Sequence, residues 1–233
     1  MKILHLADLH LQHEWFDWVS SQSRDYELLV IAGDLQNAFS GTGMHDQARA
    51  VSKWLLSLTT PTVVCSGNHD YWVSDPRVFF DVAAEARWIR DLRGKGSIVG
   101  VDGDAVEFRG LRIFVNGWLQ EPDAGPFDIV VTHAPPEACA CAGAVGRDHG
   151  DSCLLNALQS QPPTLLLCGH VHAPAKLSCK WPPLYPTCTV LVPGCDEQSE
   201  VPAHWIINTD HGVAIHSAGV VQSFDKPIGG PRR

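Results

Sequence analysis

The sequence predicts a single α/β domain, on the basis of three observations. Short apolar runs alternate with segments of helical spacing in the first half of the chain, and the second half is rich in strand-like runs. Polar clusters directly follow several of these runs. With 233 residues, 45% of them hydrophobic, the chain can bury one large core. We therefore expect one domain over residues 1–225 and a loose, Gly/Pro-rich tail over residues 226–233.

Apolar runs bounded by Gly, Asp and Pro turns predict the strands. They lie at residues 2–7, 27–32, 62–65, 97–100, 105–108, 111–116, 128–132, 164–168, 188–192, 203–208 and 213–217. The Gly and Asp turns that separate the three short runs between residues 97 and 116 favour an antiparallel arrangement of those strands.

Helical spacing of apolar residues recurs in four segments. It predicts helices at residues 14–21, 44–58, 76–93 and 150–159. Pro61 marks the end of the second of these. Residues 135–149, rich in Gly, Ala and Cys, are a candidate lid over a site, or alternatively a mobile surface connection.

Composition narrows the class of protein. The formal net charge of −9, from 17 basic and 26 acidic residues, argues against a broadly basic surface for nucleic acid. The first apolar run reaches an acidic residue too early for a signal peptide or membrane span, so we expect a soluble, cytoplasmic protein without a membrane partner. The sequence indicates no particular protein partner.

The 8 cysteines show no CxxC spacing, which indicates that most are buried free thiols. Cys139 and Cys141 leave open a third metal site or oxidation, although a mobile loop is the favoured interpretation of their segment.

Polar clusters at the ends of apolar runs carry the functional signal. They read Asp8-Leu9-His10, Gly33-Asp34, Gly67-Asn68-His69-Asp70, Thr132-His133 and Gly169-His170-Val171-His172. Functional residues of open α/β sheets gather beyond the carboxyl ends of strands, so we expect these clusters to meet in one crevice. Each cluster alone has an ordinary explanation as a cap, a turn or a strand-end histidine. Together they offer more oxygen and imidazole donors than one ion can use, which predicts two divalent metal ions.

The ordered motifs DLH, GD, GNHD, TH and GHVH resemble the signature of the calcineurin-like metallophosphoesterases. The resemblance extends from Asp8 to His172, most of the chain. It implies a four-layer αββα sandwich, in which two facing mixed sheets are flanked by helices and a dinuclear metal site lies at one sheet edge.

The same resemblance assigns roles by position. It implies ligands of the first metal at Asp8, His10 and His172, ligands of the second at Asn68, His133 and His170, and a carboxylate bridging both ions at Asp34. His69 resembles the histidine that contacts the scissile phosphate and protonates the leaving oxygen, and Asp70 is a candidate to orient it.

Hydrolysis of a phosphoester explains these residue types. Two ions about 3.5–4 Å apart can activate a bridging water and neutralise the phosphate oxygens, so that hydroxide attacks in line. Asp34 would fix their separation, and His69, titrating near neutral pH, would protonate the leaving alkoxide. Oxygen and imidazole ligation without thiolate suits Mn, Fe, Zn, Co or Ni, and the resemblance favours Mn²⁺.

The substrate follows from two finer resemblances. Residues 2–11 and the GNHD motif are similar to the SbcD-type nuclease branch of the family, whose capping and partner-binding segments this chain is too short to contain. Residues 131–136, together with GHVH, resemble the small MPPED-type cyclic-nucleotide phosphodiesterases. Both branches cleave phosphodiesters. We therefore expect a Mn²⁺-dependent phosphodiesterase acting on nucleic acid or nucleotides, with nuclease activity on single-stranded DNA and activity on 2′,3′-cyclic nucleotides.

Substrate contacts are expected at Asn68, His69 and Trp72, because unpaired bases stack on aromatic rings near such sites. Trp15 and Phe16 follow the first cluster and are weaker candidates, since most tryptophans pack in the core or at its rim. Two alternatives remain: a phosphomonoesterase on small metabolites, and a catalytically silent scaffold. The scaffold is disfavoured because every expected ligand position is filled.

Overall fold

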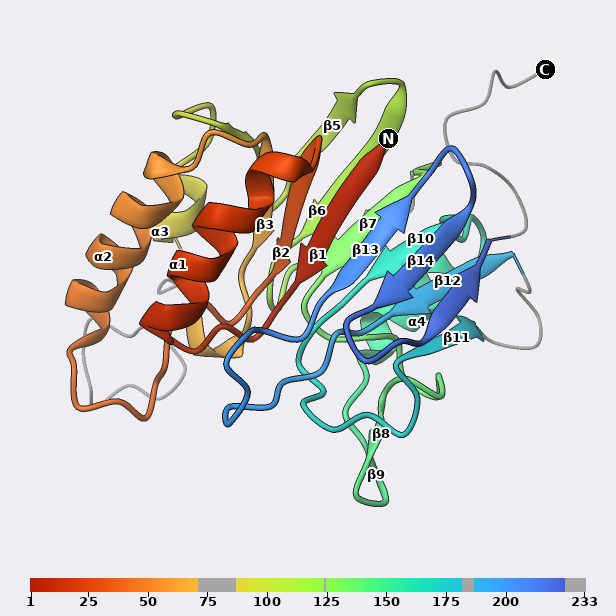
Figure 1. The fold of residues 1–233 in the computed structure, drawn as a ribbon. Helices are drawn as coiled ribbons and strands as arrows, with labels where there is room; N and C mark the ends of the chain where they lie inside the picture. Colours follow the sequence, from red (N-terminus) through yellow and green to blue (C-terminus); the bar gives the residue numbers. More distant parts are fainter. Residues whose placement is uncertain (71–86, 124, 182–186, 225–233) are drawn as a thin grey trace.

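The computed structural model describes residues 1–70, 87–123, 125–181 and 187–224. These residues form two large mixed sheets that face each other, with helices on the outer faces (Figure 1). The first sheet has 7 strands in the order β15-β14-β13-β1-β2-β3-β4, and the second has 6 strands in the order β11-β12-β10-β7-β6-β5. The expected αββα sandwich is confirmed as a fold.

The first sheet consists of β1 (Lys2–Leu6), β2 (Leu28–Ala32), β3 (Thr62–Cys65), β4 (Ile98–Gly100), β13 (Trp205–Asn208), β14 (Val213–His216) and β15 (Val221–Ser223). The second consists of β5 (Ala105–Phe108), β6 (Leu111–Asn116), β7 (Ile129–Thr132), β10 (Leu165–Leu167), β11 (Ser178–Trp181) and β12 (Cys188–Leu191). Strands β1 to β4 pair in parallel, as do β6, β7, β10 and β12. Their carboxyl ends therefore meet at one edge of each sheet.

Helices α1 (His13–Gln22), α2 (Met44–Ser57) and α3 (Arg87–Arg90) cover the outer face of the first sheet (Figure 1). Helix α4 (Ser152–Leu158) packs on the outer face of the second. Alternation along each strand explains the layers: in β2, Leu28 and Val30 point into the core between the sheets, whereas Leu29 and Ile31 point to the helices. Among the described residues, every helix is too short or too polar to cross a bilayer.

The structure departs from the sequence-based expectations at β4. This strand was expected to be antiparallel to its successors, but it joins the first sheet in parallel with β3, and only β5 and β6 form an antiparallel pair. The turn at Asp102 and Gly103 links strands of different sheets, and a Gly/Asp turn looks the same in sequence whether it closes a hairpin or crosses between sheets. The expected helix at residues 76–93 lies largely outside the described residues, which contain only its last part as α3.

Residues 135–149 contain a short hairpin, β8 (Gly143–Ala144) and β9 (Arg147–Asp148), which projects beyond the sheets (Figure 1). Cys139 and Cys141 are buried against the second sheet beside α4, as expected for most of the cysteines, and the mobility of their loop stays a prediction. Their small, apolar side chains fill the space next to Cys168 and Cys188. The structure does not test the lid interpretation.

Candidate metal centre

Loops that follow five of the parallel strands bring the predicted polar clusters to one place. Backbone hydrogen bonds fasten these loops together: the Asp8 N–H donates to the Gly33 carbonyl at 3.0 Å, and the Gly169 N–H donates to the His133 carbonyl at 2.8 Å. The second bond joins the loops after β7 and β10, and the first joins those after β1 and β2. The predicted clusters therefore lie together beyond the carboxyl ends of the strands, as expected.

Left-handed backbone is concentrated in these loops. Positive φ angles occur at Asp8 (56°), His10 (43°), Asp34 (55°) and His170 (68°). A left-handed backbone conformation at a non-glycine residue costs on the order of 1–2 kcal/mol. Such conformations persist where surrounding contacts hold them, and they cluster at functional sites. Four of the seven expected metal ligands thus share a backbone conformation that packing alone does not favour.

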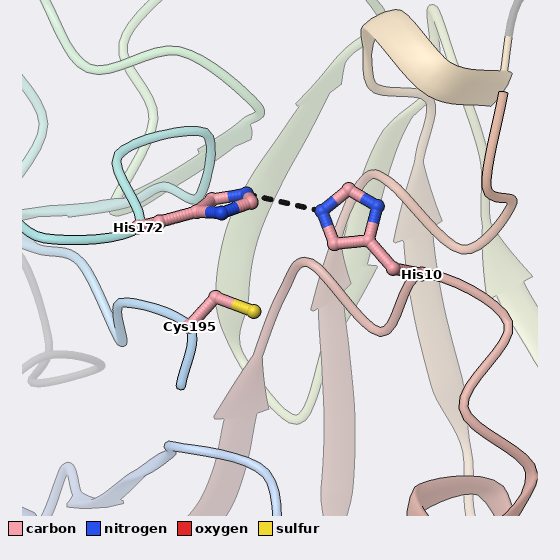
Figure 2. A group of neighbouring side chains, drawn as sticks. All are labelled: His10, His172 and Cys195. Carbon is pink, nitrogen blue, oxygen red and sulfur yellow. Dashed lines mark hydrogen bonds between the residues drawn. The ribbon is translucent and has the colours of Figure 1, made fainter. Parts of the chain in front are cut away.

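The first donor group consists of Asp8, His10 and His172. The Nε2 atoms of the two histidines lie 3.0 Å apart (Figure 2), and His172 Nε2 lies 3.6 Å from Asp8 Oδ1. Both carboxylate oxygens of Asp8 accept the backbone N–H of His170 at 3.1 Å, which holds the carboxylate in place. The nearby Asp8 carboxylate raises the pKa of His172.

The second donor group consists of Asn68, His133 and His170. Asn68 Oδ1 lies 3.0 Å from His133 Nε2 and 2.9 Å from His170 Nδ1. The Nδ1–H of His133 can donate to the Ala32 carbonyl, 2.8 Å away, and this arrangement turns Nε2 toward the other donors, as is usual for metal-binding histidines. Burial, together with the smaller effect of the charge of His133, lowers the pKa of His170 to about 4.

Asp34 lies between the two groups. Its Oδ2 is 3.2 Å from His133 Nε2 and 3.9 Å from His10 Nε2, whereas its Oδ1 accepts the backbone N–H of His69 at 2.8 Å. Burial would raise the pKa of Asp34, but the charge and hydrogen bond of His133 hold this pKa well below its usual range. Burial would lower the pKa of His133, and Asp34 instead raises it to about 9. A proton on His133 thus balances the buried Asp34 carboxylate when no cation is bound.

The donor set fits two divalent ions. Two ligands held at about 2.0–2.2 Å from one ion and at right angles lie about 3 Å apart, which matches the separations within each donor group. Groups that combine Asp8, Asp34 and His133, or His10, Asp34 and His69, also lie within 4.8 Å of one another. Carboxylate, amide oxygen and imidazole are donors that Mn, Fe, Co and Zn accept. The assignment of individual ligands stays a prediction.

His69 lies beside the first donor group, with its ring 4.7 Å from that of His10, edge to face. Its Nδ1 accepts the backbone N–H of Ala38 at 3.2 Å, so the proton of the neutral ring is on Nε2. Burial lowers the pKa of His69. Ala38, in the loop after β2, therefore determines which ring nitrogen of His69 carries a proton.

Asp70 has a different setting from the one expected. Its carboxylate accepts the backbone N–H groups of Asp34 (2.8 Å), Leu35 (3.0 Å), Gln36 (3.0 Å) and Gly67 (2.8 Å). Among the described residues, these backbone groups are the partners of both its oxygens, and the His69 ring is not. Asp70 thus positions the Asp34 loop rather than the His69 ring, and the sequence motif alone does not distinguish these roles.

Two glycines permit the close approach of the loops. A Cβ atom at Gly67 would collide with Asp34 Oδ1 and lie 2.8 Å from His133 Cε1. A Cβ atom at Gly169 would lie 2.5 Å from the Cβ atom of Ala7 and 2.9 Å from Asp8 Oδ2. Ordinary van der Waals contact begins at about 3.5 Å, so any side chain at these positions would displace the donors.

The aromatic residues near the centre differ from those expected. Trp15 and Phe16 are buried in the core under α1, which excludes them as stacking surfaces, and Trp72 lies outside the described residues. Trp118, after β6, lies beside the second donor group, 5.3 Å from the His170 ring and 5.6 Å from the His133 ring. No motif marks Trp118, because its position depends on the pairing of β6 with β7.

A cavity of about 840 Å³ adjoins the second donor group. Trp118 and His149 line it, and both rings also approach His170. Its other walls are residues 119–122, 134, 150–153, 156 and 157. The rings of Trp118 and His149 therefore line the cavity and also lie beside the second donor group, and residues 149–153 at its wall follow the β8–β9 hairpin.

Two sheets face each other, and strands of both sheets carry metal donors at their carboxyl ends. This arrangement is typical of a metal-dependent hydrolase with a sandwich fold. The sequence model of the calcineurin-like phosphoesterase family matches residues 1–174, three quarters of the chain. The protein belongs to this family, as its motifs suggested, and the activity that the family supports is hydrolysis of phosphoester bonds. No curated protein matches the sequence.

Solved structures share the fold at low sequence identity. The structure of TT1561 from Thermus thermophilus is 13% identical, with a TM-score of 0.53 over 95% of this chain and 97% of that one. The purple acid phosphatase PPD1 from yellow lupin seeds is also 13% identical, with a TM-score of 0.58 over 96% of this chain but only 52% of that one. At this identity the similarity shows the fold alone.

Proposed function

We propose that this protein is a dinuclear-metal phosphodiesterase that hydrolyses nucleic acid or nucleotides, with single-stranded DNA and 2′,3′-cyclic nucleotides as its substrates. The observation that carries the proposal is the cavity beside the second donor group, with Trp118 on its wall. A phosphodiester carries an organic group on each side of the phosphate. A cavity of about 840 Å³ whose wall includes Trp118, a neighbour of the second donor group, would give one of these groups a binding surface.

The two donor groups would hold the ions, and Asp34 Oδ2 would bridge them. Two divalent ions, for which we propose Mn²⁺, supply an activated water and neutralise charge on the phosphate oxygens. The protein's part is to hold Asp34 fixed, which it does through the Oδ1 bond to the His69 N–H and through the Asp70 carboxylate. The side chain least replaceable by a neutral one is therefore Asp34.

His69 is the proposed proton donor to the leaving oxygen. The Ala38 N–H occupies its Nδ1, so Nε2 is the atom that can donate to a phosphate beside the first donor group. Proton transfer requires the imidazolium form, in which Nδ1 also carries a proton and no longer accepts the Ala38 N–H; from that form the Nε2 proton passes to the leaving oxygen and the ring returns to neutral. A positioned proton donor contributes typically about 10²–10⁴-fold to rate. Asn68 and His69 are both proposed to contact the phosphate, and Trp72 stays a further expected contact.

Trp118 is proposed to stack on a base of the substrate. The ring is half-buried and stands next to His133 and His170, so a base bonded to a phosphate at the donors lies within its reach. Stacking of a base on an aromatic ring contributes about 1–3 kcal/mol. Such stacking tolerates sequence variation and favours unpaired strands, because bases within a duplex already stack on each other.

One assay series tests the function. Purified protein is supplied with Mn²⁺ and, in parallel, with Zn²⁺, Co²⁺ or Fe²⁺, and offered bis(p-nitrophenyl) phosphate and p-nitrophenyl phosphate. We expect faster hydrolysis of the diester. A strong preference for the monoester would overturn the phosphodiesterase proposal and favour a phosphomonoesterase on small metabolites.

Natural substrates refine the result. Linear and circular single-stranded DNA, duplex DNA and 2′,3′-cyclic AMP are compared under the best metal, and cleavage of the circle identifies an endonuclease. Asp34→Asn should abolish every activity because it removes the proposed bridge. Unchanged activity of Asp34→Asn, or no activity of the wild-type protein with any metal, would favour a catalytically silent scaffold.

A further inference from the structure

Cys195 stands beside the first donor group although no sequence motif identifies it. It follows β12 in the segment Pro193-Gly194-Cys195, and its backbone N–H donates to the His172 carbonyl at 2.9 Å. Gly194 has a φ of +76°, and a Cβ atom there would lie 3.0 Å from the same carbonyl. Glycine is therefore needed for the turn that holds Cys195 against the His172 loop.

The thiol is directed at the metal donors. Figure 2 shows the sulfur of Cys195 pointing toward the space between the imidazoles of His10 and His172. The sulfur and one ring nitrogen of each histidine lie within 4.8 Å of one another. The nearest hydrogen-bond acceptor of the thiol is the carbonyl oxygen of Asp8, another member of this group, at 3.5 Å.

These separations suit one ion. With metal–nitrogen bonds of about 2.0–2.1 Å and a metal–sulfur bond of about 2.3 Å, a nitrogen and a sulfur on one ion are at most about 4.4 Å apart. The sulfur and the two ring nitrogens, all within 4.8 Å of one another, lie close to that limit, and the Cys195 side chain is half-buried. His172 is exposed, with 42% of its side chain accessible, so solvent and ions reach this side of the centre.

We propose that Cys195 is a thiolate ligand of the first metal ion, together with His10 and His172. When the bond forms, the thiol proton passes to solvent and the sulfur lone pair is shared with the ion. Thiolate favours Zn²⁺, Fe²⁺ and Co²⁺ over Mn²⁺, whereas the second donor group offers only oxygen and imidazole. The two positions then differ in preference: a thiophilic ion at the first and a harder ion such as Mn²⁺ at the second.

This proposal rests on the dinuclear centre proposed above. It adds a thiolate to the oxygen and imidazole ligands expected there, and at the first position it replaces Mn²⁺ by a thiophilic ion. The simpler account of Cys195 is packing, because part of its side chain contacts the core under α1 and α2. Packing does not require the sulfur to face two imidazoles. Metal spectroscopy separates the two accounts, since a thiol that only packs contributes nothing to the absorption of a bound ion.

The test uses the full chain, stripped of metal and titrated with Co²⁺. The wild-type protein should show visible ligand-field bands from bound Co²⁺ and an additional near-ultraviolet charge-transfer band from a Co–thiolate bond. Cys195→Ser should lose the near-ultraviolet band and keep the ligand-field bands. Cys153→Ser is the matched control, since Cys153 is an exposed free thiol on α4, and it should keep both.

Two results would overturn the role of Cys195 and leave the dinuclear centre intact. In the first, the wild-type protein shows ligand-field bands but no near-ultraviolet band. In the second, the near-ultraviolet band survives in Cys195→Ser. No binding of Co²⁺ by the folded wild-type protein would overturn the centre itself. As a second measurement, metal content after equilibration with equal Zn²⁺ and Mn²⁺ should show one of each per chain. In Cys195→Ser the dissociation constant for Zn²⁺ should rise about tenfold or more.

Discussion

The four N–H groups that converge on Asp70 give a testable prediction about how the centre is held together. The residues that donate them, at positions 34–36 and 67, are buried, so water does not replace the carboxylate if it is lost. Replacement of Asp70 by asparagine keeps the size of the side chain but substitutes an NH₂ group for one oxygen. Two of the four backbone donors then face another donor and lose their acceptor.

Each buried N–H left without an acceptor costs about 1–3 kcal/mol, which gives about 2–6 kcal/mol for two. Burial and the nearby charge of Asp34 raise the pKa of Asp70, so removing its charge relieves some repulsion and offsets part of this loss. We therefore expect Asp70→Asn to lower the free energy of unfolding by about 2–4 kcal/mol. The free energy of unfolding of a typical domain is about 5–15 kcal/mol, so the variant should still fold.

The measurement is denaturant unfolding at neutral pH with a chelator present, followed by circular dichroism. Asp46→Asn is the matched control, because Asp46 is exposed and its ion pair with Arg49 is on the surface. This substitution should change the free energy of unfolding by less than about 0.5 kcal/mol. Asp70→Asn should also weaken metal binding about 10–100-fold through the displaced Asp34. A loss of stability below about 1 kcal/mol would refute the inference that the Asp70 carboxylate holds this loop.

Three further predictions concern packing, pH and substrate. Gly67→Ala should abolish stoichiometric metal binding in calorimetry because its Cβ atom displaces Asp34, whereas Gly41→Ala, with open space around it, should bind as the wild-type protein does. Burial lowers the pKa of His5 to about 4 from 6.5, so the unfolded chain binds a proton that the folded one rejects between these values. The free energy of unfolding therefore falls by about 3 kcal/mol as pH drops through this range. His5→Gln should reduce this dependence of the free energy of unfolding on pH. Equal pH dependence in the wild-type protein and in His5→Gln would contradict the reasoning. Trp118→Ala should raise KM for single-stranded DNA about fivefold or more and Trp118→Phe much less, and equal KM values in steady-state assays would exclude stacking.

Much of the fold and of the centre follows from local sequence, because both depend on strands that end in polar residues. Apolar runs such as residues 28–32 and 62–65 are buried on both faces and have no alternation that could confuse them with exposed strands. Parallel neighbours must end at the same edge. Donors that follow such runs are therefore brought together by the topology, whatever the details of the loops.

The remaining features depend on contacts between segments that are distant in sequence. The sequence predicts strand β4 itself, but not the sheet that it joins. That choice depends on the pairing of Thr62 with Ile98, 36 positions away. Trp118 is placed by its backbone N–H, which donates to the Ser66 hydroxyl at 2.9 Å. Cys195 is placed by the His172 carbonyl. Local composition carries no signal of any of these pairings.

The position of Asp34 shows why stability and metal binding are linked in this protein. Asp34 is buried, has a left-handed backbone, and carries a charge that the proton on the neighbouring His133 balances in the absence of cations. Each condition costs free energy, and hydrogen bonds to the loop after β3, at His69 and Asp70, offset that cost. A bound cation would replace the His133 proton and add favourable charge at the same point, because ligand binding to the folded state stabilises it. Metal should therefore raise the unfolding temperature of the wild-type protein and leave that of Asp34→Asn nearly unchanged, and a similar increase in both would place the cation away from Asp34.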